Sequence, residues 1–511
     1  MAKNIIICSD GTGNTNIKGR GTNVFKLFEA VDLNGHRMDK HLTPQVAIYD
    51  DGVGTEDFKP LKIFAGATGF GLARNVRNLY KGLVRIYDPG DSIFLFGFSR
   101  GAFTVRTLGG LISRCGILNM KQLTSAKLLQ DKVDETYGTY RKAYVTDFAK
   151  VFGAQPDLPA IKKFRDDNCL PGEVPIAFIG VWDTVDAVGL PLPISDFINA
   201  VFHRFKFPDL QLSHVVGRAC HALSIDDNRQ SFKPVLWDEG AETTPRLSQV
   251  WFAGVHSNVG GGYPKQGLSL LALDWIAWNA QQAGLRFIHS DARGYNEHAS
   301  VDDKLYNPRA GLGMFYRWKL RDVTQLCEAA HVKPAIHLSA LERAAHGTDD
   351  YAPGNLPPYA EIAFTPTGDP GRDRFAKARA DHVRDLLRCG HDHESGGKPL
   401  LSELRREVLI GDISYWMFVL SFVPLLVMLA RALVAAFSAL PPGEGWVQWI
   451  TLAKDNLWDI SWVAVEVLVG GLFLAWLLAR WAKARMSNKF STFWHELQPK
   501  MRKTLSELRN H

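Results

Sequence analysis

The stretch from Asp91 to Ile112 constrains the fold of this chain most, because it has the pattern of a strand, a tight turn and a helix. The apolar run Ile93 to Phe96 suits a buried strand, and helical spacing begins after Ala102. Between them lies Gly97-Phe-Ser-Arg-Gly101, a G-x-S-x-G motif in which the glycines permit a turn too tight for neighbouring Cβ atoms. The motif predicts a nucleophile elbow with Ser99 as the nucleophile, and a simple glycine-rich turn is the alternative.

Strand and helix patterns alternate on both sides of this turn. Ile5 to Cys8 and Val46 to Tyr49 are apolar runs typical of buried strands, and Ala73 to Tyr87 has helical spacing. Val174 to Val181 predicts a further strand, and we expect the last strand of the sheet at Ser248 to Val255. This alternation indicates an α/β protein, α/β-hydrolase-like, with a mostly parallel sheet. Residues 119–170 show helical patterns and are expected to form a helical insertion over the site.

Composition excludes several classes of protein. Of 511 residues, 46% are hydrophobic and 22% charged, which argues against disorder. The formal net charge of +6 is small for this length, so we expect no nucleic-acid partner. The six cysteines lack metal-ligand spacing and are expected to be reduced thiols, and we expect no metal and no cofactor. Only four apolar residues, Ile5 to Cys8, follow the first four residues, too few for a signal peptide.

An acidic residue follows the strand that ends in Gly180-Val-Trp-Asp-Thr-Val185. The carboxyl end of a strand, downstream of the serine, is where a hydrolase of this architecture places the carboxylate that orients its histidine. Asp183 is our candidate for this residue. Asp186, Asp226 and Asp227 are alternatives, and each of these carboxylates could instead cap a helix.

A histidine stands at the start of His256-Ser-Asn-Val-Gly-Gly-Gly-Tyr263, directly after the last predicted strand. The glycines allow the loop to bring the ring close to the serine, and the chain order becomes Ser, Asp, His. His256 is therefore the candidate base, with a structural histidine as the alternative. His214, His221 and His337 are interpreted as ordinary core or surface residues, with His221 on a helix.

The first predicted strand opens into the loop Ser9-Asp-Gly-Thr-Gly-Asn14. Backbone amides near Gly11 or Thr12 could supply one oxyanion donor, and the amide of Arg100, just after the nucleophile, the other. The alternative is a tight turn in which Asp10 accepts hydrogen bonds from loop amides.

These motifs together resemble the α/β-hydrolase-domain proteins that include one class of type VI secretion phospholipase effectors. The resemblance spans roughly residues 3–360. The motifs that carry it are Ser9 to Asn14, Gly97 to Ala102, Gly180 to Val185, His221 to Asp226 with Phe232 and Pro234, and Val250 to Tyr263.

The resemblance implies an esterase or phospholipase with Ser99 as nucleophile, His256 as base and Asp183 as its orienting carboxylate. We also expect Asp10 and Asn258 to support the catalytic site. The chain departs from the family at Asn258, where an aspartate is expected, and at Asp227-Asn228, where an acidic and then a basic residue is usual.

Two apolar stretches near the C-terminal end predict a transmembrane hairpin. Ile413 to Ala430 is 18 residues without a charge, and Ile460 to Ala479 is 20 residues with only Glu466 charged. Each is close to the ~20 residues that cross a bilayer core. Tryptophans lie between the two stretches and basic residues outside them, so the basic ends should face the cytosol.

We therefore expect four segments: a hydrolase-like domain at 1–388, a linker and juxtamembrane segment at 389–412, the hairpin at 413–482 and a basic cytosolic tail at 483–511. The protein would be a multi-pass protein of a bacterial inner membrane, with both termini cytosolic and a homo-oligomer through the hairpin.

The expected activity is hydrolysis of acyl esters of membrane lipid, chiefly phospholipids, through an acyl-enzyme. The apolar stretch 187–207 is interpreted as a lid or acyl-chain wall, with a packed core helix as the alternative. The rival function is a hydrolase-like sensing or binding module that controls a membrane-disrupting hairpin oligomer.

Overall fold

The computed structural model describes residues 2–11, 21–52, 70–142, 156–185, 210–438 and 462–507. Eight strands form one sheet, and every pairing between neighbouring strands is parallel. In sheet order they are β2 (Gln45–Asp50), β1 (Asn4–Ser9), β3 (Ser92–Phe98), β4 (Ile176–Trp182), β5 (Val216–Ser224), β6 (Leu247–Phe252), β7 (Ala335–His337) and β8 (Glu361–Ala363). The mostly parallel α/β architecture predicted from the sequence is confirmed.

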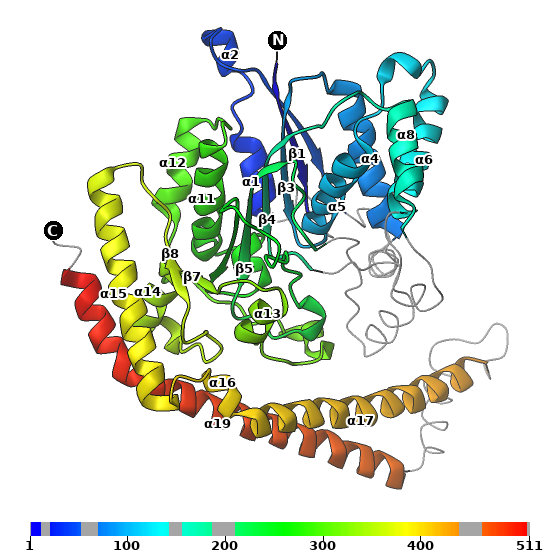
Figure 1. The fold of residues 1–511 in the computed structure, drawn as a ribbon. Coiled ribbons are helices and arrows are strands. Elements are labelled where there is room, and N and C mark those ends of the chain that lie inside the picture. Colours follow the sequence, from blue (N-terminus) through cyan, green and yellow to red (C-terminus); the bar gives the residue numbers. More distant parts are fainter. Residues whose placement is uncertain are drawn as a thin grey trace.

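Helices cover both faces of the sheet (Figure 1). The main ones are α1 (Asn23–Ala30), α4 (Phe70–Ile86), α5 (Arg100–Cys115), α6 (Ala126–Lys142), α8 (Leu158–Asn168), α10 (His256–Gly260), α11 (Gly267–Gln282), α12 (His289–His298), α13 (Val323–Ala329) and α14 (Leu338–His346). The C-terminal part adds α15 (Pro370–Ser395), α16 (Leu400–Glu403), α17 (Arg405–Ser438) and α19 (Trp462–Glu507).

Alternate residues of each central strand serve two different cores, as the period of two in a strand requires. Ile5 and Ile7 of β1 face the core under α4 and α5, whereas Ile6 and Cys8 face the core under α1 and α11. Because both faces are covered, these strands are apolar throughout. In the sheet, β2 lies on one side of β1 and β3 lies on the other, so the direction in which successive strands are added reverses at β1. Such a switch in strand order leaves a crevice at the carboxyl ends of these strands.

Three predictions about the domain are wrong in detail. His221 lies on β5 and not on a helix. The strand expected to be the last of the sheet, β6, is followed by two further strands. β7 and β8 are three residues each, too short to leave a periodic pattern. The described part of the 119–170 insertion is helical, but it packs beside α4 and α5 instead of over the site.

Residues 389–412, expected as a linker and juxtamembrane segment, are mostly helix. Cys389 and His391 belong to the last turns of α15, α16 follows, and Arg405 begins α17. The ring of His391 packs on Phe493 of α19, with ring centroids 4.7 Å apart.

Of the tail expected at 483–511, residues 483–507 form the second half of α19, which docks on the domain. Phe490, Phe493 and Leu497 are buried in the same core as α14 and α15, and the indole of Trp494 donates a hydrogen bond to the carbonyl of Pro353 at 2.9 Å. These residues recur at helical spacing, so an apolar stripe fastens the helix to the domain. Figure 1 shows α19 running from this contact out along α17.

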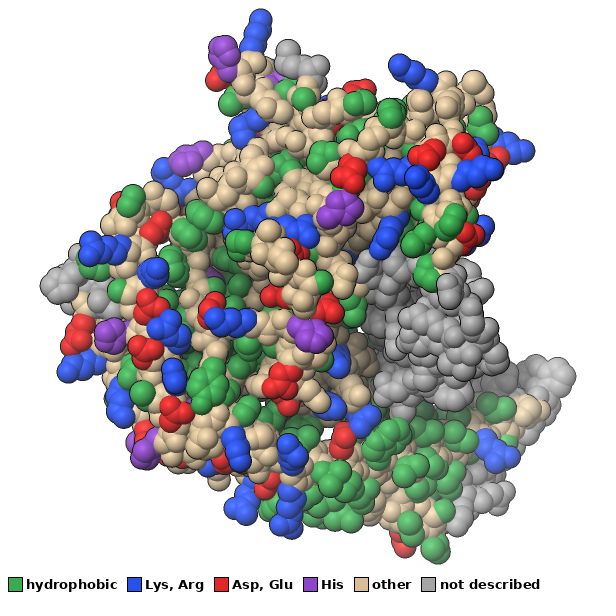
Figure 2. Space-filling view, in the orientation of Figure 1, with side chains coloured by type: hydrophobic (Ala, Val, Ile, Leu, Met, Phe, Trp, Pro, Cys, Tyr) green, Lys and Arg blue, Asp and Glu red, His purple; other side chains and the backbone are tan. Residues whose placement is uncertain are grey.

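Helices α17 and α19 pack along each other and are long and apolar enough to cross a membrane by length and composition. In their most apolar windows only 11% and 6% of residues are buried. A core helix of a soluble protein would be mostly buried, so the exposed apolar surface, visible along these helices in Figure 2, is what a bilayer would cover.

Candidate functional site

Ser99 occupies a strained turn between β3 and the first residue of α5. Its φ of 59° and ψ of −122° lie in a region that non-glycine residues rarely adopt. A Cβ at Gly97 would lie 2.5 Å from the carbonyl oxygen of Gly101, and one at Gly101 would collide with the backbone of Ser9. Both glycines of the motif are therefore required by the close approach of β1, β3 and α5.

His256 begins α10, shortly after β6 ends. Gly254, with a φ of 113°, makes the turn that separates strand from helix. The imidazole lies between two aromatic rings, Phe98 at 4.6 Å and Phe232 at 5.0 Å between centroids. A Cβ at Gly260 would collide with the ring of Phe98, so this glycine leaves room for the aromatic wall behind the histidine.

Asp183 lies directly after β4 and is also strained, with a φ of 37°. Its amide donates to the carbonyl of Ala222 at 2.7 Å, and the amide of Thr184 donates to Nε2 of His221 at 3.1 Å. His221 therefore has a structural place beneath the turn, and burial lowers its pKa to about 3.

The three side chains form a hydrogen-bonded chain. Ser99 Oγ lies 2.8 Å from His256 Nε2, and His256 Nδ1 lies 2.6 Å from Asp183 Oδ2. An ionised carboxylate only accepts hydrogen bonds, so Nδ1 carries the proton and Nε2 of the neutral ring is the acceptor for the serine hydroxyl. All three side chains are buried.

Arg321 and Ser224 fix the carboxylate of Asp183. The guanidinium donates to Oδ1 at 2.7 Å and to Oδ2 at 3.0 Å, while the Ser224 amide donates to Oδ1 at 3.0 Å. Burial alone would raise the pKa of Asp183, but the charge of Arg321 and the hydrogen bond to His256 outweigh it and hold the pKa well below its usual value. The carboxylate is therefore ionised at neutral pH.

The pKa of His256 is lowered from its usual 6.5. Burial is the largest cause, because it penalises the charged ring, and Asp183 opposes it only in part. A neutral imidazole at pH 7 can accept a proton from a hydroxyl.

Two of the competing aspartates contact other groups. Asp226 accepts from the amide of Gly254 at 2.6 Å and from the hydroxyl of Tyr351 at 3.0 Å. Asp227 accepts from the backbone amide of His256 at 3.1 Å and pairs with Arg229. Both fix the backbone around His256, and of these aspartates Asp183 is the one that contacts its ring. Asp186 lies outside the described residues.

The loop after β1 lies next to the Ser99 turn, where Asp10 accepts hydrogen bonds from its surroundings. The donors are the amide of Gly11 at 2.6 Å, the hydroxyl of Thr22 at 2.6 Å and the hydroxyl of Tyr49 at 2.7 Å. This geometry matches the alternative in which Asp10 orders the loop. Thr12 lies outside the described residues, and so does the stretch 187–207.

Arg100 and Asn258 have different places around the site. Arg100 is the first residue of α5, so its amide lies at the positive end of the helix, next to Ser99. The side-chain amide of Asn258 donates to the carbonyl of Lys304 at 3.1 Å, and its oxygen accepts from the amide of Tyr306 at 3.3 Å. Asn258 thus joins α10 to the backbone of the segment at 304–306.

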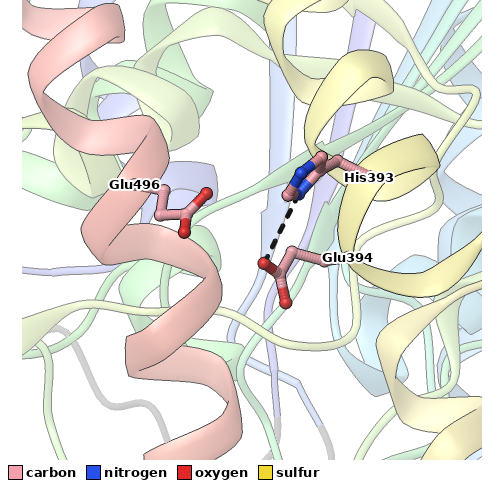
Figure 3. A group of neighbouring side chains, drawn as sticks. All are labelled: His393, Glu394 and Glu496. Atoms are coloured by element: carbon pink, nitrogen blue, oxygen red, sulfur yellow. Dashed lines mark ion pairs between the residues drawn. The ribbon is translucent and has the colours of Figure 1, made fainter.

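A separate group of metal-binding residue types lies on α15 and α19. Among the described residues, ligand atoms of His393, Glu394 and Glu496 lie within 4.8 Å of one another (Figure 3). The His393 side chain is 77% exposed and lies 3.7 Å from Glu394. An exposed ion pair facing a carboxylate on a second helix is sufficient to explain this group.

The fold and the site define an α/β protein whose parallel sheet brings a serine, a histidine and an aspartate into one hydrogen-bonded chain. A family model described as "T6SS, Phospholipase effector Tle1-like, catalytic domain" matches residues 3–279. The match covers more than half of the chain, so the chain belongs to this family.

Other similarities are more distant. The uncharacterized protein YEL023C of Saccharomyces cerevisiae (strain ATCC 204508 / S288c) is 28% identical over an alignment of 253 residues, and the match covers 46% of this chain and 33% of that protein. The chain thus spans about a third of the length of this curated relative.

Two solved structures are also similar. An uncharacterized protein from Pseudomonas aeruginosa has a TM-score of 0.33 and 17% identity, over 81% of this chain and 66% of that one. The Tle1 effector bound to the VgrG spike from the type 6 secretion system has a TM-score of 0.29 and 19% identity, over 51% of each chain. Neither likeness is close enough to carry a functional conclusion.

Proposed function

We propose that the protein is a membrane-anchored serine hydrolase that cleaves acyl esters of phospholipids. The observation that carries this proposal is the hydrogen-bonded chain from Ser99 through His256 to Asp183. Membership of a phospholipase effector family supports a lipid substrate. The Ser, Asp, His order and the strand–turn–helix around Ser99 support an α/β-hydrolase type of fold.

In the first half of the reaction, His256 Nε2 takes the hydroxyl proton of Ser99 as Oγ attacks the ester carbonyl carbon. The imidazolium that forms is stabilised by Asp183, whose negative charge Arg321 keeps in place. The tetrahedral intermediate then collapses to an acyl-enzyme, and the leaving alcohol takes the proton from His256.

In the second half, a water molecule gives its proton to His256 and attacks the acyl-enzyme. Collapse of this intermediate releases the fatty acid and returns the proton to Ser99. The negative oxygen of both intermediates would be stabilised by the amide of Arg100 at the start of α5, together with an amide from the loop at Gly11 or Thr12.

The anchoring part of the proposal rests on α17 and α19. The beginning of α17 and the second half of α19 both contact the catalytic domain, so the hairpin leaves this domain and returns to it. The domain then lies on one side of the bilayer, which we propose is the cytosolic face of a bacterial inner membrane. Association of copies through the hairpin stays a prediction.

Labelling with a fluorophosphonate tests the mechanism, because the probe needs an activated serine. We expect label on Ser99 of the full chain, loss of label in Ser99→Ala, and a fall in ester hydrolysis by about 10⁴-fold or more. Ser113→Ala, on the same helix, is the matched control. Absence of label on Ser99 in folded protein would contradict the serine mechanism.

Phospholipid in nanodiscs tests the substrate class. Release of fatty acid from nanodiscs supports a phospholipase, whereas cleavage of short soluble esters alone would remove the lipid assignment and leave the serine mechanism intact.

If Ser99→Ala kept its full biological effect and loss of the hairpin removed it, the rival membrane-disrupting function would be supported.

A further inference from the structure

A cavity of about 490 Å³ lies where the hairpin meets the catalytic domain. Its apolar wall includes Phe418 and Phe422 of α17, Ala475 and Ala479 of α19, and Trp318 of the domain. A second cavity of about 420 Å³ shares part of this wall and also reaches the polar side chains of Asn228 and Ser487. The two together give an apolar compartment that continues into a more polar one.

Two cationic side chains lie where the two compartments meet, because Arg309 and Lys483 line both cavities. Arg309 Nε is buried and has no hydrogen-bond partner among the described residues. Burial lowers the pKa of Arg309, but a guanidinium stays protonated in proteins. Asp350 adds one negative charge to the second cavity, so a net positive charge remains to attract an anion.

With the hairpin in the bilayer as proposed above, the cavity lies at the level of the membrane surface. Its lining on α17 begins near Ile413, where the uncharged stretch starts, and on α19 it continues past Ala479, where that stretch ends. A lipid in the adjoining leaflet would have its acyl chains along the hairpin and its phosphate near Lys483. Apolar walls with cations at one end therefore match a phospholipid better than a wholly polar or a wholly apolar ligand.

One segment of the domain connects this cavity to the histidine. The ring of Phe315 packs on Phe422 with centroids 5.2 Å apart, and the next residue, Tyr316, packs on Phe232 at 5.4 Å. Phe232 in turn contacts the ring of His256. The segment that lies against the hairpin thus also supports the wall of the catalytic site.

We propose that this cavity binds a diacyl phospholipid, with the phosphate between Arg309 and Lys483 and an acyl chain among Phe418, Phe422 and Ala479. The cavity then holds the lipid at the membrane surface, against the segment that also supports the wall of the catalytic site. It is therefore a substrate-recruiting site. This last step rests on the proposed phospholipase function, whereas the binding itself does not.

Photo-labelling tests the binding without catalysis. Full-length Ser99→Ala protein in nanodiscs is irradiated with a phosphatidylglycerol that carries a diazirine in its acyl chain, and labelled peptides are mapped by mass spectrometry. We expect label in residues 414–422 and 472–486. Unlabelled phosphatidylglycerol should compete, whereas diacylglycerol, without the phosphate, and inorganic phosphate, without the chains, should not.

Lys483→Gln should reduce this labelling by about ten-fold, the effect of one charge-assisted hydrogen bond. Arg485→Gln removes the same charge from the same helix outside the cavity, and it should leave the labelling unchanged. Ala479→Trp should also reduce labelling, because the indole fills the apolar compartment. Equal labelling of the Lys483→Gln and Arg485→Gln proteins, or competition by diacylglycerol as strong as by the phospholipid, would overturn the proposal.

With Ser99 intact, the ratio of phospholipid to soluble-ester hydrolysis should fall about ten-fold in Lys483→Gln, through KM. An unchanged ratio would overturn the recruiting role. If no variant hydrolysed any ester, the proposed function would fail, and the photo-labelling would still decide whether the cavity binds phospholipid.

Discussion

Arg321 binds both carboxylate oxygens of Asp183, at 2.7 and 3.0 Å, from a position 138 residues further along the chain. Both side chains are buried, so each charge is compensated chiefly by the other. Breaking a buried ion pair from one side leaves an uncompensated charge.

Arg321→Met should therefore lower the free energy of unfolding at neutral pH by about 3–5 kcal/mol. Activity should fall with it, because the carboxylate then takes up a proton more easily and holds the imidazolium less well. Chemical denaturation of the catalytic domain and ester hydrolysis measure the two effects. Arg317→Met, which removes a more exposed partner of Asp412, is the control and should cost much less.

Asp183→Asn and Asp226→Asn form a matched pair of buried substitutions. Asp183 contacts the ring of His256, so Asp183→Asn should reduce kcat by about 10⁴-fold by favouring the wrong tautomer. Asp226→Asn should have a small effect, because it can still accept from Gly254. Similar losses in the two variants, measured on folded protein, would show that Asp183 has no special role.

Activity should decline on acidification with a midpoint below pH 6.5. Burial lowers the pKa of His256 from 6.5, and the reaction needs the neutral ring. Asp183 does not titrate in this range, since its pKa is held well below 3.8. The pH profile of kcat/KM on a soluble ester measures the midpoint, and a value at or above 6.5 would contradict the expected shift.

The same shift makes the fold less stable as the pH falls. The unfolded chain takes up a proton on His256 near pH 6.5, whereas the folded chain does so only at lower pH. The stability that the neutral His256 ring contributes is therefore complete above pH 6.5 and is lost as the pH falls from 6.5 through the lower pKa of the folded chain. Denaturation of Ser99→Ala at several pH values should show this loss, together with that of His221, whose pKa burial also lowers.

Sequence alone could place Ser99 and His256 after strands, because glycines mark both turns, and it made Asp183 the first candidate among four aspartates. Parallel strands end at one edge of a sheet, so residues that end different strands come together. Arg321 could not be found this way. It lies in an irregular segment before α13, and nothing in the local pattern indicates which carboxylate it binds.

The docking of α19 is different, because the signal was present in the sequence. Met486, Phe490, Phe493, Leu497 and Met501 recur every three or four residues, which predicts one apolar helix face. The interpretation as a basic tail rested on its charge and not on this spacing. β7 and β8 could not be predicted, since three residues carry no period.

Cysteine labelling tests the proposed topology with the residues that the chain already has. Cys389 is exposed, whereas Cys8, Cys115, Cys169, Cys220 and Cys327 are buried. Burial raises the pKa of Cys115, Cys169, Cys220 and Cys327 to about 12. It also raises the pKa of Cys8, so these five thiols should react slowly. Cys389 is thus a native reporter for the side on which the catalytic domain lies.

Ser438, at the far end of α17, supplies the second reporter as Ser438→Cys. In spheroplasts, a membrane-impermeant maleimide should label the thiol introduced at this position from outside and reach Cys389 only after lysis, because the hairpin leaves the domain and returns to it. Cys389→Ser is the control for assigning the labelled thiol. Labelling of Cys389 in intact spheroplasts would show that the domain lies outside the cytosol, and the inner leaflet could then not be the source of its substrate.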